Sequence, residues 1–324
     1  MKKLIPLFLF ICTANQVFAQ NNNPYKQVDE YVKKLGALEA FNVAVIADTL
    51  TRQFAEKEQK ARAIFYWTAN NIALDPKAIK SNDNKKTDPV LVVQLRKATS
   101  LGFALLIQEM CSMAKIRCLT VDGYVKSSSE DINNKPDEIN HSWNVVQLGQ
   151  SPEQWYYIDA AKASGYLDKK QTLFTPLFTS EYFFADRLLF NLDHYPDNHA
   201  WLLGDGPKGL GEFYALPIIS SAAYLYGMQK PMPLNGYIKT KTTALTNFSF
   251  TCSNAGSLAS ITLLMGDGNK QQKPVPMNFT NTSGLIKFSY TFKREDTFPF
   301  ISWRMEKKFY SIWWKWLNKN LCLV

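Results

Sequence analysis

Cysteine is scarce in this chain, with five residues in 324. The four that follow the first 19 residues are widely separated, and they are Cys111, Cys118, Cys252 and Cys322. Their spacing matches neither a zinc site nor a small scaffold held together by disulfides. We predict that they are mostly buried thiols, and a Cys111–Cys118 bridge is the one disulfide that the sequence leaves open.

Histidine is scarcer still, with three residues. No cysteine or acid pair stands at metal-ligand spacing beside His194 or His199, so these two histidines are assigned structural or surface roles. We therefore predict no metal site and no cofactor.

Long apolar runs are absent after the start of the chain. The run Leu4–Cys12 is shorter than the roughly 20 residues that span a bilayer, so no transmembrane segment is expected. Met1-Lys2-Lys3, this run and the small-residue site Val17-Phe18-Ala19 have the layout of a bacterial-type secretory signal peptide. Cleavage after Ala19 would give a soluble, exported protein in the periplasm or outside the cell.

A clustered basic stripe is also absent. The formal charge is +9, and removing Lys2 and Lys3 with the leader leaves +7, spread along the chain. Spread charge favours loose attraction to acidic surfaces and excludes a nucleic-acid footprint. The last residues, Lys307 to Trp316, mix lysine with aromatic side chains. They are either closing strands of a β domain or a segment that associates with a membrane surface.

Helical patterns fill the region before residue 115. Tyr25–Leu50 predicts one or two short helices, and Glu56–Asn71 predicts an amphipathic helix with Trp67 in the core and Arg62 on the polar face. Lys80–Asp88 is polar and predicts a loop. Leu101–Ala114 is so apolar that its helix must be buried, with Thr99 or Ser100 as its N-terminal cap.

Strand patterns dominate the remainder. Cys118–Lys126, Ser142–Leu148 and Trp155–Asp159 follow the buried helix, and this segregation favours an α+β domain with an antiparallel sheet. Short β-rich runs between Asn235 and Phe292, separated by turn residues, predict a smaller all-β sandwich. We place the signal peptide at 1–19, the first folded domain at 20–205 and the C-terminal β-rich domain at 206–324.

Three polar residues occupy ends of these predicted elements. Ser100 begins the buried helix, His141 begins one strand and Asp159 ends the next. Antiparallel pairing of the two strands would bring His141 and Asp159 together. A nucleophile at a helix N-terminus, a histidine base and an orienting carboxylate are the parts of an acyl-transfer site.

The segments that carry these residues resemble the transglutaminase-like superfamily of papain-type folds. The resemblance covers about residues 40 to 205 and rests on Ala61–Trp67, Arg96–Leu106, Cys118–Tyr124, His141–Asn144 and Tyr157–Ala160. Phe190–Leu203, with His194-Tyr195-Pro196, is similar to the segment that follows this core in kyphoscoliosis-peptidase-like members. The family pattern of Gly-x-Cys-x-Gly-Tyr-Ala places its nucleophilic cysteine at Ser100 and its first glycine at Ala98.

The resemblance implies an active-site cleft with Ser100, His141 and Asp159 at the triad positions. Ligand-binding roles are expected for four neighbours, namely Gly102, Phe103, Trp143 and Asn144. Thiol pKa values fall to roughly 3.5 in favourable sites, so a cysteine there is ionised before it attacks. A serine hydroxyl does not ionise in this way.

Three functions stay open at this point. The leading interpretation is a pseudoenzyme that binds a peptide, a protein or a cell-wall peptide in the cleft without turnover. The second is an active acyl hydrolase or transferase that uses Ser100, His141 and Asp159. The third is a non-catalytic scaffold or adhesion protein.

Overall fold

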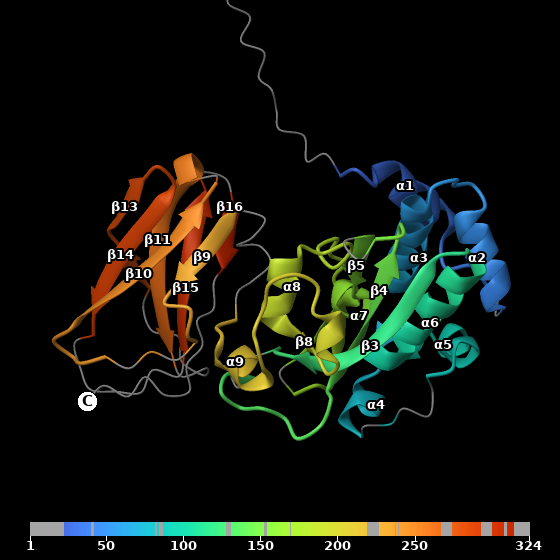
Figure 1. The fold of residues 1–324 in the computed structure, drawn as a ribbon, viewed down its shortest axis with the longest axis horizontal. Helices are drawn as coiled ribbons and strands as arrows, with labels where there is room; N and C mark the ends of the chain where they lie inside the picture. Colours follow the sequence, from blue (N-terminus) through green and yellow to red (C-terminus); the bar gives the residue numbers. More distant parts are fainter. Residues whose placement is uncertain are drawn as a thin grey trace, which may run out of the picture.

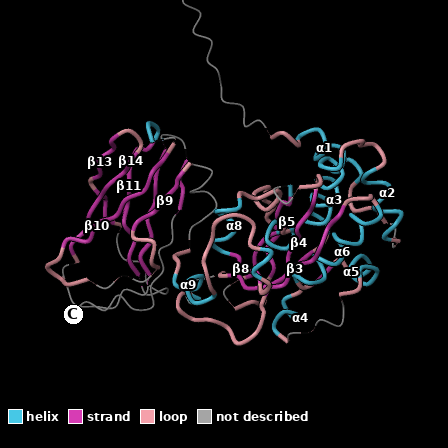
Figure 2. Tube along the Cα trace, in the orientation of Figure 1, coloured by secondary structure: helices cyan, strands magenta, loops and turns pink. Residues whose placement is uncertain are grey.

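The structure is a computed structural model. It describes residues 23–39, 42–81, 83, 87–127, 131–151, 154–168, 170–218, 227–236, 238, 240–253, 255–266, 274–292, 300–307 and 310–313. The predicted signal peptide and its cleavage site lie outside these residues. Helices and strands mix in the first half of the chain, and strands dominate the second half (Figures 1 and 2).

The helices that precede the central sheet gather on one side of it (Figure 1). They are α1 (Lys26–Leu35), α2 (Val43–Thr51), α3 (Lys57–Asn71), α4 (Pro76–Lys80), α5 (Pro89–Leu95) and α6 (Ser100–Met113). The helices predicted from periodicity are confirmed, while α4 was not predicted and neither was α5. Its start is nonetheless encoded, since Asp88 accepts hydrogen bonds from the backbone of Val90 and Leu91, and Pro89 occupies the first turn.

Helices α3 and α6 form the centre of the first core. Trp67, Phe65 and Leu106 are fully buried there. Arg62, predicted on the polar face of α3, is also fully buried, which corrects that prediction. Its guanidinium makes two hydrogen bonds to Asp29 of α1, at 2.7 and 2.8 Å, and burial of this charge is tolerated because the pair is bidentate.

The central sheet is antiparallel throughout, with strand order β5-β4-β3-β8. Its strands are β3 (Arg117–Val125), β4 (His141–Gln147), β5 (Trp155–Ile158) and β8 (His194–Pro196). The predicted strands and their antiparallel arrangement are confirmed, and β8 was not predicted. Because β4 and β5 run in opposite directions, the start of β4 lies beside the end of β5.

Shorter elements complete the first half. They are β1 (Ala73–Leu74) paired in parallel with β2 (Lys97–Ala98), α7 (Ala160–Ser164), β6 (Gly165–Leu167) paired with β7 (Phe174–Pro176), α8 (Arg187–Asp193), a 3-10 turn (His199–Trp201) and α9 (Leu210–Ala215).

The second half contains two four-stranded sheets, ordered β13-β14-β10-β9 and β12-β11-β15-β16. Their strands are β9 (Met228–Met232), β10 (Leu245–Cys252), β11 (Leu258–Gly266), β12 (Val275–Met277), β13 (Phe279–Thr282), β14 (Leu285–Thr291), β15 (Phe300–Lys307) and β16 (Tyr310–Trp313). Side chains from both sheets, including Phe250, Ile261 and Ile286, share one core. The predicted β-sandwich is confirmed.

The turn signal at the β13–β14 hairpin is explained by backbone geometry. Ser283 and Gly284 have φ values of 50° and 87°, the pair of positive angles that a two-residue type I′ turn requires. Part of the C-terminal aromatic segment forms β15 and β16, as expected for closing strands. Residues 308, 309 and 314–324 lie outside the described structure, so surface association through this tail stays a prediction.

Helix α9 packs on the first half. Phe213 and Tyr214 form a cluster with Tyr195, and the Lys126 ammonium contacts the backbone carbonyls of Phe213 and Leu216 at 2.9 and 3.0 Å. Residues up to Leu216 therefore contact the first half, and the predicted domain boundary between residues 205 and 206 stays a prediction.

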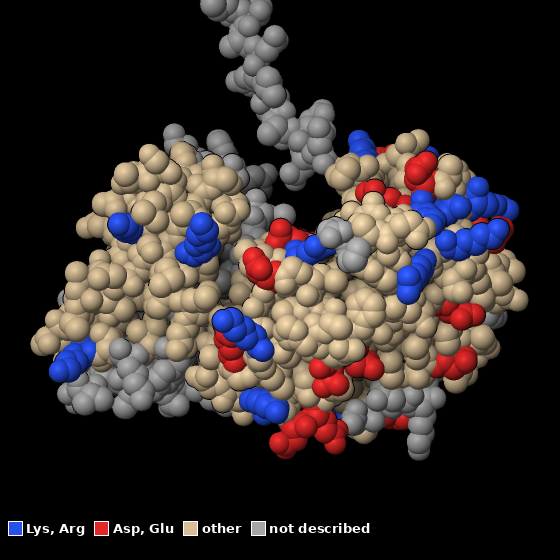
Figure 3. Space-filling view, in the orientation of Figure 1, with Lys and Arg blue, Asp and Glu red and all other residues tan. Residues whose placement is uncertain are grey.

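Cys111, Cys118 and Cys252 are buried thiols, and the open Cys111–Cys118 bridge is not formed. Burial, followed by the interaction with Cys111, raises the pKa of Cys118 well above its usual value. Within the described part of the chain, we find no helix with the length and apolar character of a membrane span. Charges of both signs are interspersed over the first half and sparse over the second on the face shown in Figure 3.

Candidate functional site

Ser100 is the first residue of α6, and its side chain does not cap that helix. Thr99 holds the N-cap position with φ −76° and ψ 169°, and its side chain makes no capping hydrogen bond. The Ser100 hydroxyl instead accepts a hydrogen bond of 3.2 Å from the backbone N–H of Ser142 in β4. Ser100 as a cap was therefore wrong, because a residue already inside the helix turns its side chain away from the free amides.

His141 and Asp159 lie together, as the antiparallel pairing of β4 and β5 requires. The pairing places Asn144 opposite Ile158, and the Nε2 atom of His141 stands 2.6 Å from Oδ2 of Asp159. Asp159 is fully buried and His141 keeps 10% of its side chain exposed. The described hydrogen bonds include none between Ser100 and His141. The Ser100 hydroxyl contacts β4 at Ser142, one residue after the histidine.

Asp159 is also the N-cap of α7. Its Oδ1 atom accepts a hydrogen bond of 2.8 Å from the backbone N–H of Lys162. One carboxylate oxygen thus begins a helix while the other faces His141, and this double use fixes the plane of the carboxylate.

His194 is a site residue that sequence reasoning missed. It is fully buried, and its Nε2 atom lies 3.0 Å from Oδ2 of Asp159. The other ring nitrogen, Nδ1, lies 2.6 Å from Oδ1 of Asp193. A surface role for His194 is therefore wrong, whereas His199 is exposed as expected. The signal in the sequence was the His-Tyr-Pro run, but β8 is too short for its pairing with β3 to be read from alternation.

Burial and the neighbouring charges act in opposite directions on these groups. Burial lowers the pKa of His141 and outweighs the Asp159 charge that would raise it. Burial raises the pKa of Asp159, but the charges and hydrogen bonds of His141 and His194 outweigh it and hold the pKa well below its usual range.

The pKa values of His194 and Asp193 shift in opposite directions. Burial lowers the pKa of His194, yet the Asp193 charge and the hydrogen bonds to both carboxylates outweigh it, so the net shift is upward. The pKa of Asp193 is lowered, because the charge of His194 outweighs burial.

The donor atoms of His141, Asp159 and His194 lie within 4.8 Å of one another, a spacing at which a metal ion has to be considered. Donor atoms around tetrahedral zinc lie about 3.3 Å apart, as metal–ligand lengths of about 2.0–2.1 Å require. The 2.6 Å contact between His141 and Asp159 is a direct hydrogen bond that leaves no room for an ion. These residues do not fit a metal in this arrangement.

The comparison with protein families identifies this region. A family model of the transglutaminase-like superfamily matches residues 45–160, which include Ser100, His141 and Asp159. Residues 45–160 are a transglutaminase-like domain. His194 lies beyond the matched residues and completes the hydrogen-bonded network from outside them.

Two curated relatives match a longer part of the chain. Kyphoscoliosis peptidase of Mus musculus is 30% identical over 197 residues, which are 60% of this chain and 29% of that protein. The Homo sapiens protein of the same name is 29% identical over 217 residues, or 67% of this chain and 32% of its own. The chain therefore spans about a third of the length of these relatives.

A solved structure described as a TGase shares 16% sequence identity with this chain. The match covers 45% of this chain and 35% of that one, with a TM-score of 0.27. An overlap this low carries no argument about function.

Four residues of the transglutaminase-like domain were expected to bind a ligand, and all four are buried. Phe103, Trp143 and Asn144 are each 1% exposed. Asn144 ties the sheet to the helix through a hydrogen bond of 2.9 Å from its Nδ2 to the carbonyl oxygen of Ala104. At Gly102 a Cβ atom would lie 2.8 Å from Cβ of Ala98, so this glycine allows close packing. The direct ligand contacts that were expected of these four residues are therefore not available to them, and they pack in the interior behind the site.

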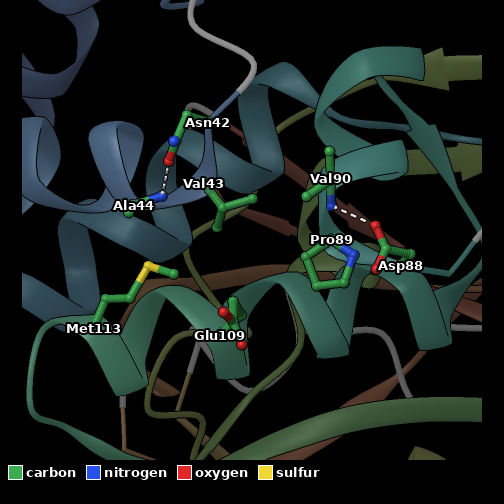
Figure 4. A pocket seen from close by; sticks show the side chains of 8 residues that line it. All are labelled: Asn42, Val43, Ala44, Asp88, Pro89, Val90, Glu109 and Met113. Carbon is green, nitrogen blue, oxygen red and sulfur yellow. Dashed lines mark hydrogen bonds between the residues drawn. The ribbon is translucent and has the colours of Figure 1, made fainter.

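One depression lies away from the triad positions. It measures about 630 Å³ and is lined by Asn42, Val43, Ala44, Asp88, Pro89, Val90, Glu109 and Met113. Figure 4 shows these side chains between α2, α5 and the C-terminal half of α6. Neither Ser100 nor His141 lines it, so it is no part of the candidate site.

Proposed function

We propose that this chain is a transglutaminase-like protein that binds an extended peptide beside Ser100 and His141 without turning it over. Ser100 takes the place at which the superfamily pattern has its cysteine. The observation that carries the proposal is the Ser100 hydroxyl, which sits next to the His141–Asp159 pair yet bonds to the backbone of Ser142.

Three physical features disfavour turnover. A serine hydroxyl does not ionise near neutral pH, so attack needs a base that removes its proton during the reaction. His141 would be that base, but it makes no hydrogen bond to Ser100. His194 competes for the same oxygen of Asp159, and this lowers the support that Asp159 gives to a protonated His141.

Peptide binding is supported by what remains accessible around the pair. Ser100 is partly exposed, and Ile139, two residues before His141, exposes 43% of its surface beside the site. The curated relatives are named as peptidases, which act on polypeptide chains, and we carry only that class of ligand to this chain. The ligand would be a protein segment or a cell-wall peptide.

An acyl hydrolase or transferase is the second candidate. It is favoured by the intact pair, because Asp159 binds Nε2 of His141 and leaves Nδ1 as the nitrogen that could accept a proton from Ser100. A serine triad would then require the Ser100 hydroxyl to turn from the N–H of Ser142 toward this nitrogen.

Labelling with a fluorophosphonate probe separates the two candidates. The proposal expects no modification of Ser100 by mass spectrometry after incubation near neutral pH, with Ser100→Ala as the blank. Stoichiometric labelling of Ser100 would establish the serine hydrolase instead.

Replacing Ser100 with cysteine tests whether the remaining machinery is aligned. We expect the Ser100→Cys thiol to react with iodoacetamide near pH 7 at least about tenfold faster than an exposed control, Ser81→Cys, because an adjacent histidine and a helix N-terminus lower thiol pKa values. Equal rates would indicate a site that has lost its alignment, which favours the scaffold function.

Binding itself is tested with a fluorescently labelled unfolded casein and, in a second arm, a synthetic cell-wall tetrapeptide. Ser100→Trp should lower the affinity for whichever probe binds, since the indole would occupy the mouth of the site, and Ser81→Trp should leave it unchanged. An affinity that is the same in both variants would place the binding elsewhere.

Export is proposed on the N-terminal pattern alone. N-terminal sequencing of the protein recovered from a bacterial periplasm or medium should begin at Gln20. An intact Met1 in a cytoplasmic fraction would overturn it.

A further inference from the structure

The Asp193–His194 pair extends the site beyond the residues that the superfamily pattern supplies. We infer that His194 is a buried imidazolium clamped between two carboxylates, and that it is a positioning residue that holds Asp159 against His141. The inference concerns the orientation of His141 and holds whether or not the site binds a peptide.

The protonation of His194 follows from its partners. Both ring nitrogens face carboxylate oxygens, Nδ1 at 2.6 Å from Asp193 and Nε2 at 3.0 Å from Asp159. An ionised carboxylate only accepts hydrogen bonds, so each nitrogen must carry a proton. A histidine with two N–H groups is a cation, and pairing with two carboxylates is what makes such a cation tolerable in the interior.

The surroundings hold this ring in one orientation. The ring of Phe190 stacks on that of His194, with centroids 3.8 Å apart and planes at 14°, and Trp143 meets it edge-on at 5.2 Å. The ring therefore cannot turn without displacing the core of the sheet. The fixed Nε2 donates to Asp159, whose other oxygen is held by the N–H of Lys162.

Charged and titratable groups from several elements face the clamp. Tyr182 donates to Asp193 at 3.2 Å from the loop before α8, and the charge of Lys162 in α7 lowers the pKa of Asp193 and that of His141. Lys126, at the end of β3, feels the charge of Asp193. His141 in β4 is the remaining neighbour, and the charge of His194 lowers its pKa.

Removal of the His194 charge should change the titration of His141 in one direction. His141 and His194 share one oxygen of Asp159, and the charge of His194 lowers the pKa of His141, so removal of that charge should raise the pKa of His141. His141 would then take up a proton at higher pH.

Nitrogen-15 NMR of the imidazole rings in the full chain tests this directly, and three histidines make assignment straightforward. In the wild type, both nitrogens of His194 should remain protonated at pH 7. In His194→Gln, which keeps an N–H donor but removes the charge, the midpoint of the His141 titration should rise by about one pH unit.

A second variant covers a failure of His194→Gln to fold. Asp193→Asn removes one of the two carboxylates, so His194 should lose its second proton at pH 7. The matched control is Asp197→Asn, an exposed acid just after β8, which should leave the His194 signals unchanged.

Three results would overturn the inference. The first is a neutral His194 in the wild type at pH 7, and the second is an unaltered His141 titration in a folded His194→Gln protein. The third is stoichiometric zinc binding that moves the signals of His141 and His194 together, which would make these residues metal ligands.

Discussion

The two halves of the chain bury different kinds of side chain. The first half encloses Arg62, Lys126, Asp159 and His194, each with a partner of opposite charge or a carbonyl oxygen. In the described part of the second half, the buried side chains are apolar apart from Thr246. Since buried charges cost free energy unless they are paired, their concentration in one half marks where the fold serves a site as well as its own stability.

The largest effect on this contrast should come from Arg62→Ala. Removal of the guanidinium leaves the Asp29 carboxylate with an unpaired charge and empties a space among five aromatic rings, so we expect a loss of about 3–5 kcal/mol in the free energy of unfolding. Urea denaturation measures it. Lys287→Ala, an exposed lysine in β14, is the control and should change stability by less than about 0.5 kcal/mol.

The double variant Asp29→Leu, Arg62→Leu sharpens the comparison. It replaces both charges with apolar groups, the kind of side chain that fills the core of the β half. The loss in the free energy of unfolding should be smaller than for Arg62→Ala alone. A double variant that is the less stable of the two would mean that the ion pair itself stabilises the first half.

The apolar core of the second half is probed by Ile286→Ala. Ile286 is fully buried, and truncation of such a side chain costs about 2–5 kcal/mol. Hydrogen exchange should quicken at the amides of β10 and β14 and stay unchanged in α3 and α6. Equal acceleration in both halves would contradict separate cores.

Lys126 makes the first half sensitive to pH. Burial lowers its pKa to about 7, against an ordinary value of about 10.4 in the unfolded chain. Between these values the unfolded state binds a proton that the folded state does not, so the free energy of unfolding should rise with pH, by about 2 kcal/mol from pH 7 to 9. Lys126→Met should flatten this rise in urea titrations, and an identical slope in both proteins would show that Lys126 titrates normally.

The smallest effect is expected at the β13–β14 turn. Gly284 has a φ of 87°, which an alanine adopts only with strain, so Gly284→Ala should cost about 1 kcal/mol. Gly209→Ala is the control, because Gly209 has an ordinary φ of −166° and open space around it. Thermal denaturation should show a lower midpoint for the first variant only.

Much of the fold could be predicted because its signals are local. Apolar spacing located α3 and α6, and alternation located β3 and β4. The antiparallel direction of β4 and β5 then predicted that His141 lies beside Asp159. Arg62 was misplaced because periodicity assigns a charge to the polar face and cannot see a partner 33 residues away. His194 was missed because β8 has three residues and its role depends on a neighbour 35 positions earlier.

The double use of Asp159 makes the fold depend on a residue of the site. Its loss would remove the cap of α7 as well as the partner of His141, and a lost cap alone costs about 0.5–2 kcal/mol. A substitution of Asp159 would therefore weaken the fold as well as the site. An intact histidine–aspartate pair is then a record of folding requirements as much as of chemistry.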